Sequence, residues 1–179
     1  MKGAGQVNRP NDPVGIWWGN PGMKRPKMAV TTMDDPIADL VRKTAHKVLA
    51  TWAADCAGRV LPFFEEKNPE DTRPRRAIEA IREWARTGAF VMADVRKTSL
   101  AAHAAARDVQ EGDPARSAAR AAGQAMATAH LPAHAIAAAI YAATAVRDAA
   151  DPGDADAAAL KEREWQYQHL LRLREQLAS

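Results

Sequence analysis

Residues 101–150 read AAHAAARDVQEGDPARSAARAAGQAMATAHLPAHAIAAAIYAATAVRDAA, and they hold 23 of the 41 alanines of the 179-residue chain. Alanine has the highest intrinsic helix propensity and very little bulk, so alanine-rich helices form readily and can approach one another closely. We therefore expect this stretch to supply the core helices of an all-α fold.

Cap and proline signals mark a first helix upstream of this stretch. Asp35 suits the N-cap position, and Pro36 suits the first helical position because of its fixed torsion and missing N–H donor. Apolar residues then recur at three- and four-residue steps, which predicts one helix from Asp34 to about Gly58. Pro62 would remove a helical hydrogen bond, so we expect a kink or a separate short turn around it.

The same signals predict the remaining helices. Their expected ranges are about 75–88, 90–109, 113–130, from after the Leu131–Pro132 break to about 150, and 154–177. In the helix at 75–88, Trp84 belongs to the apolar stripe and is expected in the core. In the last helix, charged residues are expected on the solvent-facing side: Lys161, Glu162, Arg163, Glu164, Arg172, Arg174 and Glu175.

These ranges predict an all-α fold of about six helices joined by short loops, arranged as a bundle or as stacked helical hairpins. Residues 34–179 are expected to form a single domain, since a chain of this length needs no second core. Residues 1–33 show no helical or strand period and are expected to be an extended or disordered N-terminal tail. Alternatively, Trp17 and Trp18 could anchor that tail on the domain.

The basic charge is concentrated outside the predicted domain. Residues 1–33 contain five basic residues against Asp12 alone, which leaves 20 basic and 21 acidic residues in the remainder. A nucleic-acid-binding module usually carries its basic charge on the folded surface. We therefore do not expect DNA or RNA to be the main partner.

Cysteine content and hydropathy indicate the compartment. Cys56 is the only cysteine, which excludes an intrachain disulfide and fits a reducing environment. The first residues lack the apolar stretch of a secretion signal, and no apolar run of about 18 residues appears. We expect a cytoplasmic protein without a membrane partner, in which Cys56 is a small buried hydrophobe rather than a nucleophile.

Three blocks of sequence carry a family resemblance. They are WAADCAGRVLPFFE at 52–65, RPRRAIEAIREWARTG at 73–88, and AHAAAR with ARAAGQAMATAHLPAHAIAAAIYAATAV within 102–146. Together they resemble the putative immunity protein family of bacterial polymorphic toxin systems, over roughly residues 45–170. The resemblance implies a non-catalytic protein that neutralises a cognate toxin by direct binding, with a protein toxin as its partner.

Two groups of residues are candidates for a functional or interface role. The basic group Arg73, Arg75 and Arg76 could grip a carboxylate or phosphate, since arginine binds both in a bidentate way. The alternative is a solvated helix start with local ion pairs such as Arg75 with Glu79. His103 and Arg107 form an i, i+4 pair that could organise an interface or a buried polar contact.

The spacing of His130 and His134 is that of some zinc ligands on one helical face. Pro132 lies between them, so packing or capping is the favoured interpretation. We assign no metal, no cofactor and no catalytic residue, and the oligomeric state is left open. The alternative function is a small enzyme or ligand-binding domain, in which His103, Arg107, His130 and His134 surround a pocket between helices.

Overall fold

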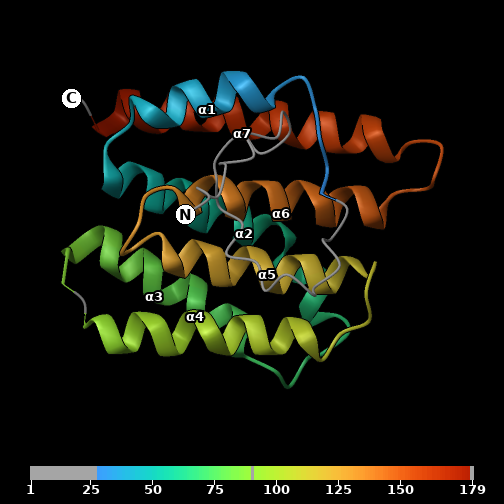
Figure 1. The fold of residues 1–179 in the computed structure, drawn as a ribbon, viewed down its shortest axis with the longest axis horizontal. Helices are drawn as coiled ribbons and strands as arrows, with labels where there is room; N and C mark the ends of the chain where they lie inside the picture. The colour runs from blue at the N-terminus through green and yellow to red at the C-terminus, as the bar shows by residue number, and fades with distance from the viewer. Residues whose placement is uncertain (1–27, 90, 178–179) are drawn as a thin grey trace, which may run out of the picture.

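The structure is a computed structural model that describes residues 28–89 and 91–177. Within these residues the chain forms seven α-helices and no strand, so the all-α prediction is confirmed (Figure 1). The helices are α1 (Asp34–Arg42), α2 (His46–Glu65), α3 (Arg73–Thr87), α4 (Met92–Arg107), α5 (Pro114–Ala127), α6 (His134–Ala149) and α7 (Ala155–Leu177). The predictions for residues 1–27, including a Trp17–Trp18 anchor, lie outside the described part of the chain.

The single first helix expected from Asp34 to Gly58 is wrong, because α1 and α2 are separate helices. The hydroxyl of Thr44 donates to the carbonyl of Leu40 at 2.7 Å, and Ala45 adopts an extended backbone. The N–H groups of Lys43 and Thr44 close the last turn of α1 through i to i−3 hydrogen bonds, and the extended Ala45 then separates the two helices. The start also differs, since Met33 rather than Asp35 occupies the N-cap position.

Pro62 does not divide α2, which runs through it to Glu65, so the separate short turn does not form. The proline itself is exposed, whereas Val60, Leu61 and Phe64 around it are buried in the core. Burying these three side chains offsets the helical hydrogen bond that proline cannot make.

Alanine-rich α5 lies at the centre of the fold. It packs against α2, α3, α4 and α6, and α6 in turn packs against α2 and α7. Several alanines of α5 have no exposed surface: Ala115, Ala118, Ala119, Ala121, Ala122 and Ala125. Figure 1 shows α5 and α6 in the middle of the molecule, with α1 and α7 on one side and α4 on the other. The small side chains therefore allow one helix to contact four others.

Two helix ends follow their sequence signals. Gly88 ends α3 with φ of 74°, a left-handed conformation that glycine adopts without strain. The carboxylate of Asp113 accepts a hydrogen bond from the backbone N–H of Ala115 at 2.9 Å, and Pro114 begins α5. The predicted cap and proline at this point are confirmed.

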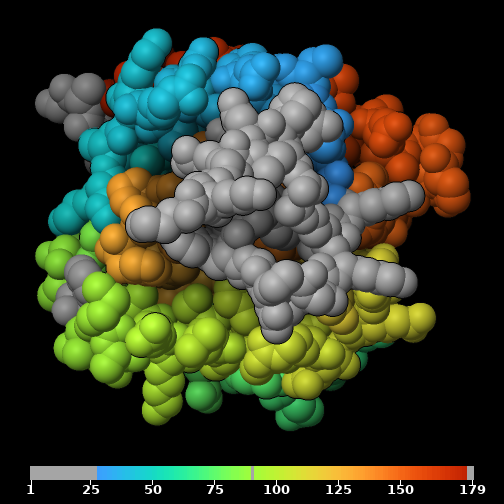
Figure 2. Space-filling view, viewed as in Figure 1, coloured from blue at the N-terminus to red at the C-terminus, as the bar shows by residue number. Residues whose placement is uncertain are grey.

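Residues 28–33 pack against the helices before α1 begins. Ala29 is 4% exposed, and its N–H donates to the hydroxyl of Thr144 on α6 at 3.1 Å. Figure 2 shows α1 along one edge of the visible face and α4 along the opposite edge. This short segment therefore joins the folded unit that was expected to begin at Asp34.

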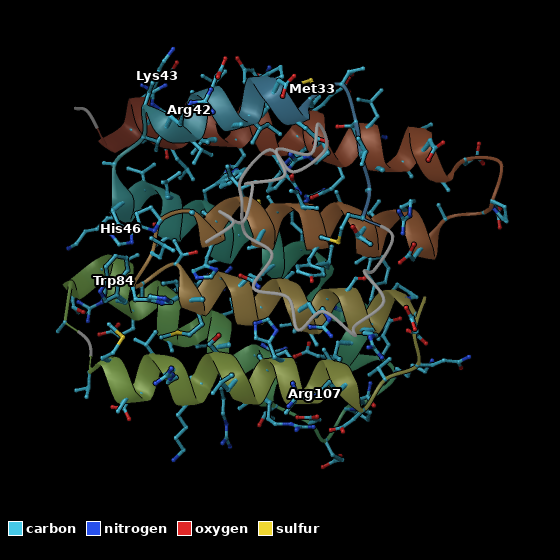
Figure 3. The ribbon with its side chains drawn as sticks, viewed as in Figure 1. Met33, Arg42, Lys43, His46, Trp84 and Arg107 are labelled. Carbon is cyan, nitrogen blue, oxygen red and sulfur yellow. The ribbon has the colours of Figure 1, made fainter. Side chains whose placement is uncertain are left out.

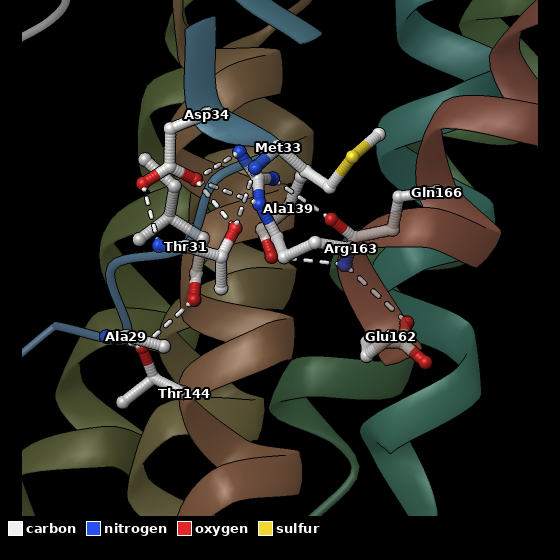
Figure 4. Close-up of polar contacts among 10 residues, drawn as sticks. Ala29, Thr31, Met33, Asp34, Ala139, Thr144, Glu162, Arg163 and Gln166 are labelled. Atoms are coloured by element: carbon white, nitrogen blue, oxygen red, sulfur yellow. Dashed lines mark hydrogen bonds and ion pairs between the residues drawn. The ribbon is translucent and has the colours of Figure 1, made fainter. Parts of the chain in front are cut away.

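A buried polar network connects α1, α6 and α7 (Figure 4). The guanidinium of Arg163 is 1% exposed, and it donates to Asp34 at 2.9 and 3.1 Å and to Gln166 at 2.8 Å. Gln166 donates to the carbonyl of Ala139 at 3.0 Å. Glu162 is also buried, so the expectation that Glu162 and Arg163 face solvent is wrong.

Within residues 28–89 and 91–177, no helix is long and apolar enough to cross a bilayer. Trp84 is 7% exposed, which confirms its predicted place in the core. Its ring lies 4.8 Å from that of His46, whose Nε2 is 2.5 Å from the carbonyl oxygen of Thr128. These contacts hold α2, α3 and the end of α5 together. In Figure 3 they lie at the opposite end of the molecule from Arg107.

Candidate functional site

The basic group at the start of α3 is held by carboxylates. The Arg73 guanidinium donates to Asp71 at 2.6–3.1 Å and to Asp108 at 2.7 Å. These hydrogen bonds raise the pKa of Arg73, and they lower the pKa of Asp71. Arg73 therefore links the loop before α3 to the end of α4.

Arg75 and Arg76 do not join Arg73 in one anion grip. Arg75 donates to Glu65 at 2.6 and 2.7 Å, so its partner is at the end of α2 rather than the expected Glu79. Arg76 is exposed on α3. The group is best described as a set of surface ion pairs at a helix start.

His103 lies between α4 and α5, where it meets Gly123. A Cβ atom at Gly123 would lie 2.7–2.9 Å from three atoms of the imidazole ring, so only glycine leaves room for it. The Nδ1 atom is buried and has no hydrogen-bond partner within residues 28–89 and 91–177. Burial lowers the pKa of His103 to about 4, and the charges of Arg120 and Arg107 add to this shift.

His134 begins α6 and is also buried. Its Nδ1 atom lies 2.7 Å from Oε1 of Gln124, and this contact fixes the imidazole as the donor to the amide oxygen. Burial lowers the pKa of His134 to about 4, with a further contribution from His130. The ring of His130, which is exposed, lies 5.1 Å from that of His134.

Arg107 and Arg120 lie close to His103, and Arg116 lies with Arg120 near Tyr141; we call these three residues the arginine cluster. Arg107 is exposed in the last turn of α4. Arg120 lies 6.0 Å from the ring centre of Tyr141 on α6, and Arg116 donates to the carbonyl of Val109 at 2.9 Å. No carboxylate in the described part of the chain forms an ion pair with any of the three.

The nearest carboxylates in the sequence bind elsewhere. Asp108 follows Arg107 directly, yet it pairs with Arg73. Asp113 precedes α5, where it caps the helix and pairs with Lys67. The positive charges of the arginine cluster are therefore left without compensation from the described residues.

A different arrangement connects α2 with α7. Arg59 donates to buried Glu162 at 3.0–3.3 Å and lies 3.8 Å over the ring of Trp165. Trp165 stacks on His169 with ring centres 4.8 Å apart, and His169 Nε2 lies 2.9 Å from Asp55. In this region the arginine and histidine side chains therefore have carboxylate and aromatic partners within the chain.

Sequence reasoning identified only part of these two regions. His103 interacts electrostatically with Arg107 and His134, and His134 contacts His130, so these four predicted residues are neighbours in the structure. Arg116 and Arg120 were not singled out, although their i, i+4 spacing places them on one face of α5. The α2–α7 contacts join residues about a hundred positions apart, so no local sequence pattern predicts them.

The chemistry of the histidine region is that of packing. His103 fills the space above Gly123, and His134 bonds to Gln124. Throughout residues 28–89 and 91–177, no three His, Cys, Asp or Glu side chains gather in a group that could hold a metal ion. Cys56 is fully buried, and burial raises the pKa of its thiol, which makes the thiolate unfavourable.

A family model described as Imm-5 like putative immunity protein matches residues 39–173, from α1 to α7. The chain belongs to this family. No curated protein and no solved structure matches the chain. The matched residues include His103, His134, the arginine cluster and the α2–α7 contacts. These features therefore lie within the part of the chain that the family model covers.

Proposed function

We propose that this protein is a non-catalytic binding protein that neutralises a bacterial toxin by direct contact. The match to the Imm-5 like family over residues 39–173 carries the proposal. An inhibitor of this kind needs a stable scaffold and a complementary surface. The closely packed α5 and α6 supply the scaffold, and the exposed charges of α4 with the half-buried arginines of α5 supply a surface for electrostatic recognition.

The electrostatics of the histidines favour binding over acid–base catalysis. An efficient general acid or base has a pKa near the working pH. The pKa values of His103 and His134 are about 4, so both rings are neutral near pH 7 and are weak bases. Their contacts with Gly123 and Gln124 support a packing role rather than the alternative enzyme or ligand-binding pocket.

A toxin-neutralising protein acts in the compartment where the toxin would harm its producer. We therefore propose the cytoplasm as its location and a cognate protein toxin as its partner. The fully reduced state of Cys56, buried in α2, fits this location.

Co-expression with the toxin encoded beside its gene tests the proposal. We expect the full-length protein to restore growth of cells that produce this toxin, and the two purified proteins to elute together in size-exclusion chromatography. A deletion that removes α5 and α6 should abolish both effects. Restored growth without a complex, or a turnover reaction that consumes a substrate of the toxin, would contradict the proposal.

A further inference from the structure

The arginine cluster carries positive charge that the described residues do not neutralise. Asp108 and Asp113, the carboxylates closest in sequence, are engaged by Arg73 and Lys67. Tyr141, at the floor of this region, interacts electrostatically with Arg120 and Arg116 and with no acidic residue. A site with several guanidinium groups and no internal counter-ion is suited to an anionic ligand.

The spacing of the cluster suits carboxylates. Arg116 and Arg120 are four residues apart, which separates them by about 6 Å along the axis of α5. Acidic residues four apart on a partner helix have the same separation, so each carboxylate can meet one guanidinium. Arg107 on α4 and Arg120 on α5 both lie close enough to His103 to lower its pKa, so Arg107 extends this surface to a third contact.

The interior next to the cluster strengthens this attraction. The His103 ring is neutral near pH 7, and Tyr141 is 8% exposed, so the wall beneath the guanidinium groups is poorly solvated. A charge pair beside such a wall is screened less than a pair surrounded by water. The same wall offers the aromatic and aliphatic contacts that accompany arginine in protein interfaces.

We propose that the arginine cluster on α4 and α5 is the docking surface for an acidic, Asp- and Glu-rich segment of a protein partner. This inference rests on the proposed function, and it adds the location and the charge of the interface. Residues 34–179 contain 20 basic and 21 acidic residues, so no broad positive surface is available for a nucleic acid.

A charge-reversal variant tests the surface with a defined probe. The probe is a fluorescent peptide of about eight consecutive glutamates, and its affinity is measured by anisotropy against the full-length protein in low salt. We expect Arg107→Glu, Arg116→Glu and Arg120→Glu together to weaken binding by at least about tenfold. The matched control reverses the same number of charges at arginines that already have carboxylate partners, Arg42, Arg75 and Arg86, and should bind like the wild type.

Nuclear magnetic resonance supplies a second readout that does not depend on the variants. A carboxylate bound beside His103 should raise the pKa of that ring from about 4. Circular dichroism confirms that each variant is folded. Equal affinity of the two triple variants, or a peptide that leaves His103 unchanged, would overturn the proposal. Tighter binding of a single-stranded RNA than of the peptide would overturn it as well.

Neutralisation of the neighbouring toxin separates this inference from the proposed function. If the wild type and the cluster variant protect cells equally, the docking surface is wrong and the proposed function stands. If neither protects, but the peptide binds only through the cluster, the surface stands and the proposed function is wrong. Protection by the wild type and the control variant, with loss in the cluster variant, supports both.

Discussion

Arginine has two different environments in this protein. On the side formed by α1, α2 and α7, Arg163 is paired with Asp34 and Arg59 with Glu162. On the side formed by α4 and α5, none of the described carboxylates pairs with Arg107, Arg116 or Arg120. The first environment satisfies its charges internally and contributes to the fold. The second leaves its charges available to a partner and contributes little to folding.

Removing one guanidinium from each environment is the strongest test of this comparison. Arg163→Met removes the buried guanidinium that donates to part-buried Asp34 and to fully buried Gln166, and we expect a loss of about 2–4 kcal/mol in the free energy of unfolding. Arg107→Met removes an exposed charge, and we expect a change within about 0.5 kcal/mol. Urea unfolding followed by circular dichroism measures both. Similar losses in the two variants would show that the environments are energetically alike.

The pH dependence of stability tests whether His103 and His134 stay neutral in the folded protein. His103 and His134 have pKa values of about 4 in the folded protein, against an ordinary value of 6.5. The unfolded chain therefore takes up protons between these values that the folded chain does not, and stability falls as the pH decreases through this window. From about pH 7 to about pH 5 we expect a loss of about 1–2 kcal/mol for each histidine.

Urea unfolding at a series of pH values measures this loss. The double variant His103→Gln with His134→Gln should show a flatter profile over the same window. A wild type whose stability is constant from pH 7 to pH 5, or a double variant with the full slope, would contradict buried neutral histidines.

A substitution at Gly123 tests whether the His103 ring packs against α5. Gly123→Ala places a methyl group 2.7–2.9 Å from the ring, closer than van der Waals contact allows. We expect a net loss of about 1–2 kcal/mol, after the higher helix propensity of alanine offsets part of the overpacking. Thermal and urea unfolding measure it. In a His103→Ala background the same change should be neutral or stabilising, and equal losses in both backgrounds would exclude the clash.

The smallest effect is expected within the arginine cluster itself. Arg116 and Arg120 are like charges at i, i+4, which destabilises a helix slightly. Arg120→Gln should therefore raise the free energy of unfolding by about 0.2–0.5 kcal/mol in low salt, and the gain should fade as salt is added. It should also raise the pKa of His103, because Arg120 lowers it. A loss of stability in low salt would reveal a partner for Arg120 within the chain.

The sequence predicts most of the helices because their end signals are local. Gly88 and the Asp113–Pro114 pair act on their own backbone, so the ends that they mark appear in the structure. The break between α1 and α2 was missed because neither glycine nor proline marks it, and the residues between the two helices are Lys43, Thr44 and Ala45. The continuation through Pro62 was missed because distant packing partners of α2 determine it.

The functional regions were predicted less completely than the helices, because their charge and burial depend on residues distant in the sequence. His103 and Arg107 could be identified because they lie four apart on one helix. The charge state of the cluster could not, since it depends on Asp108 and Asp113 pairing with Arg73 and Lys67 instead. Arg163 looks like any charged residue of a solvent-facing helix, and only the approach of α1 to α7 buries it.

The Arg163–Asp34 pair also has a consequence for synthesis of the chain. The two residues are 129 positions apart, and α1 makes its main contacts with α6 and α7. At a translation rate of about 5–20 residues per second, Asp34 waits on the order of ten seconds for its partner to be made. During that interval α2 to α6 can assemble while α1 lacks its ion-pair partner on α7, so the docking of α7 is the step that completes the contacts of α1.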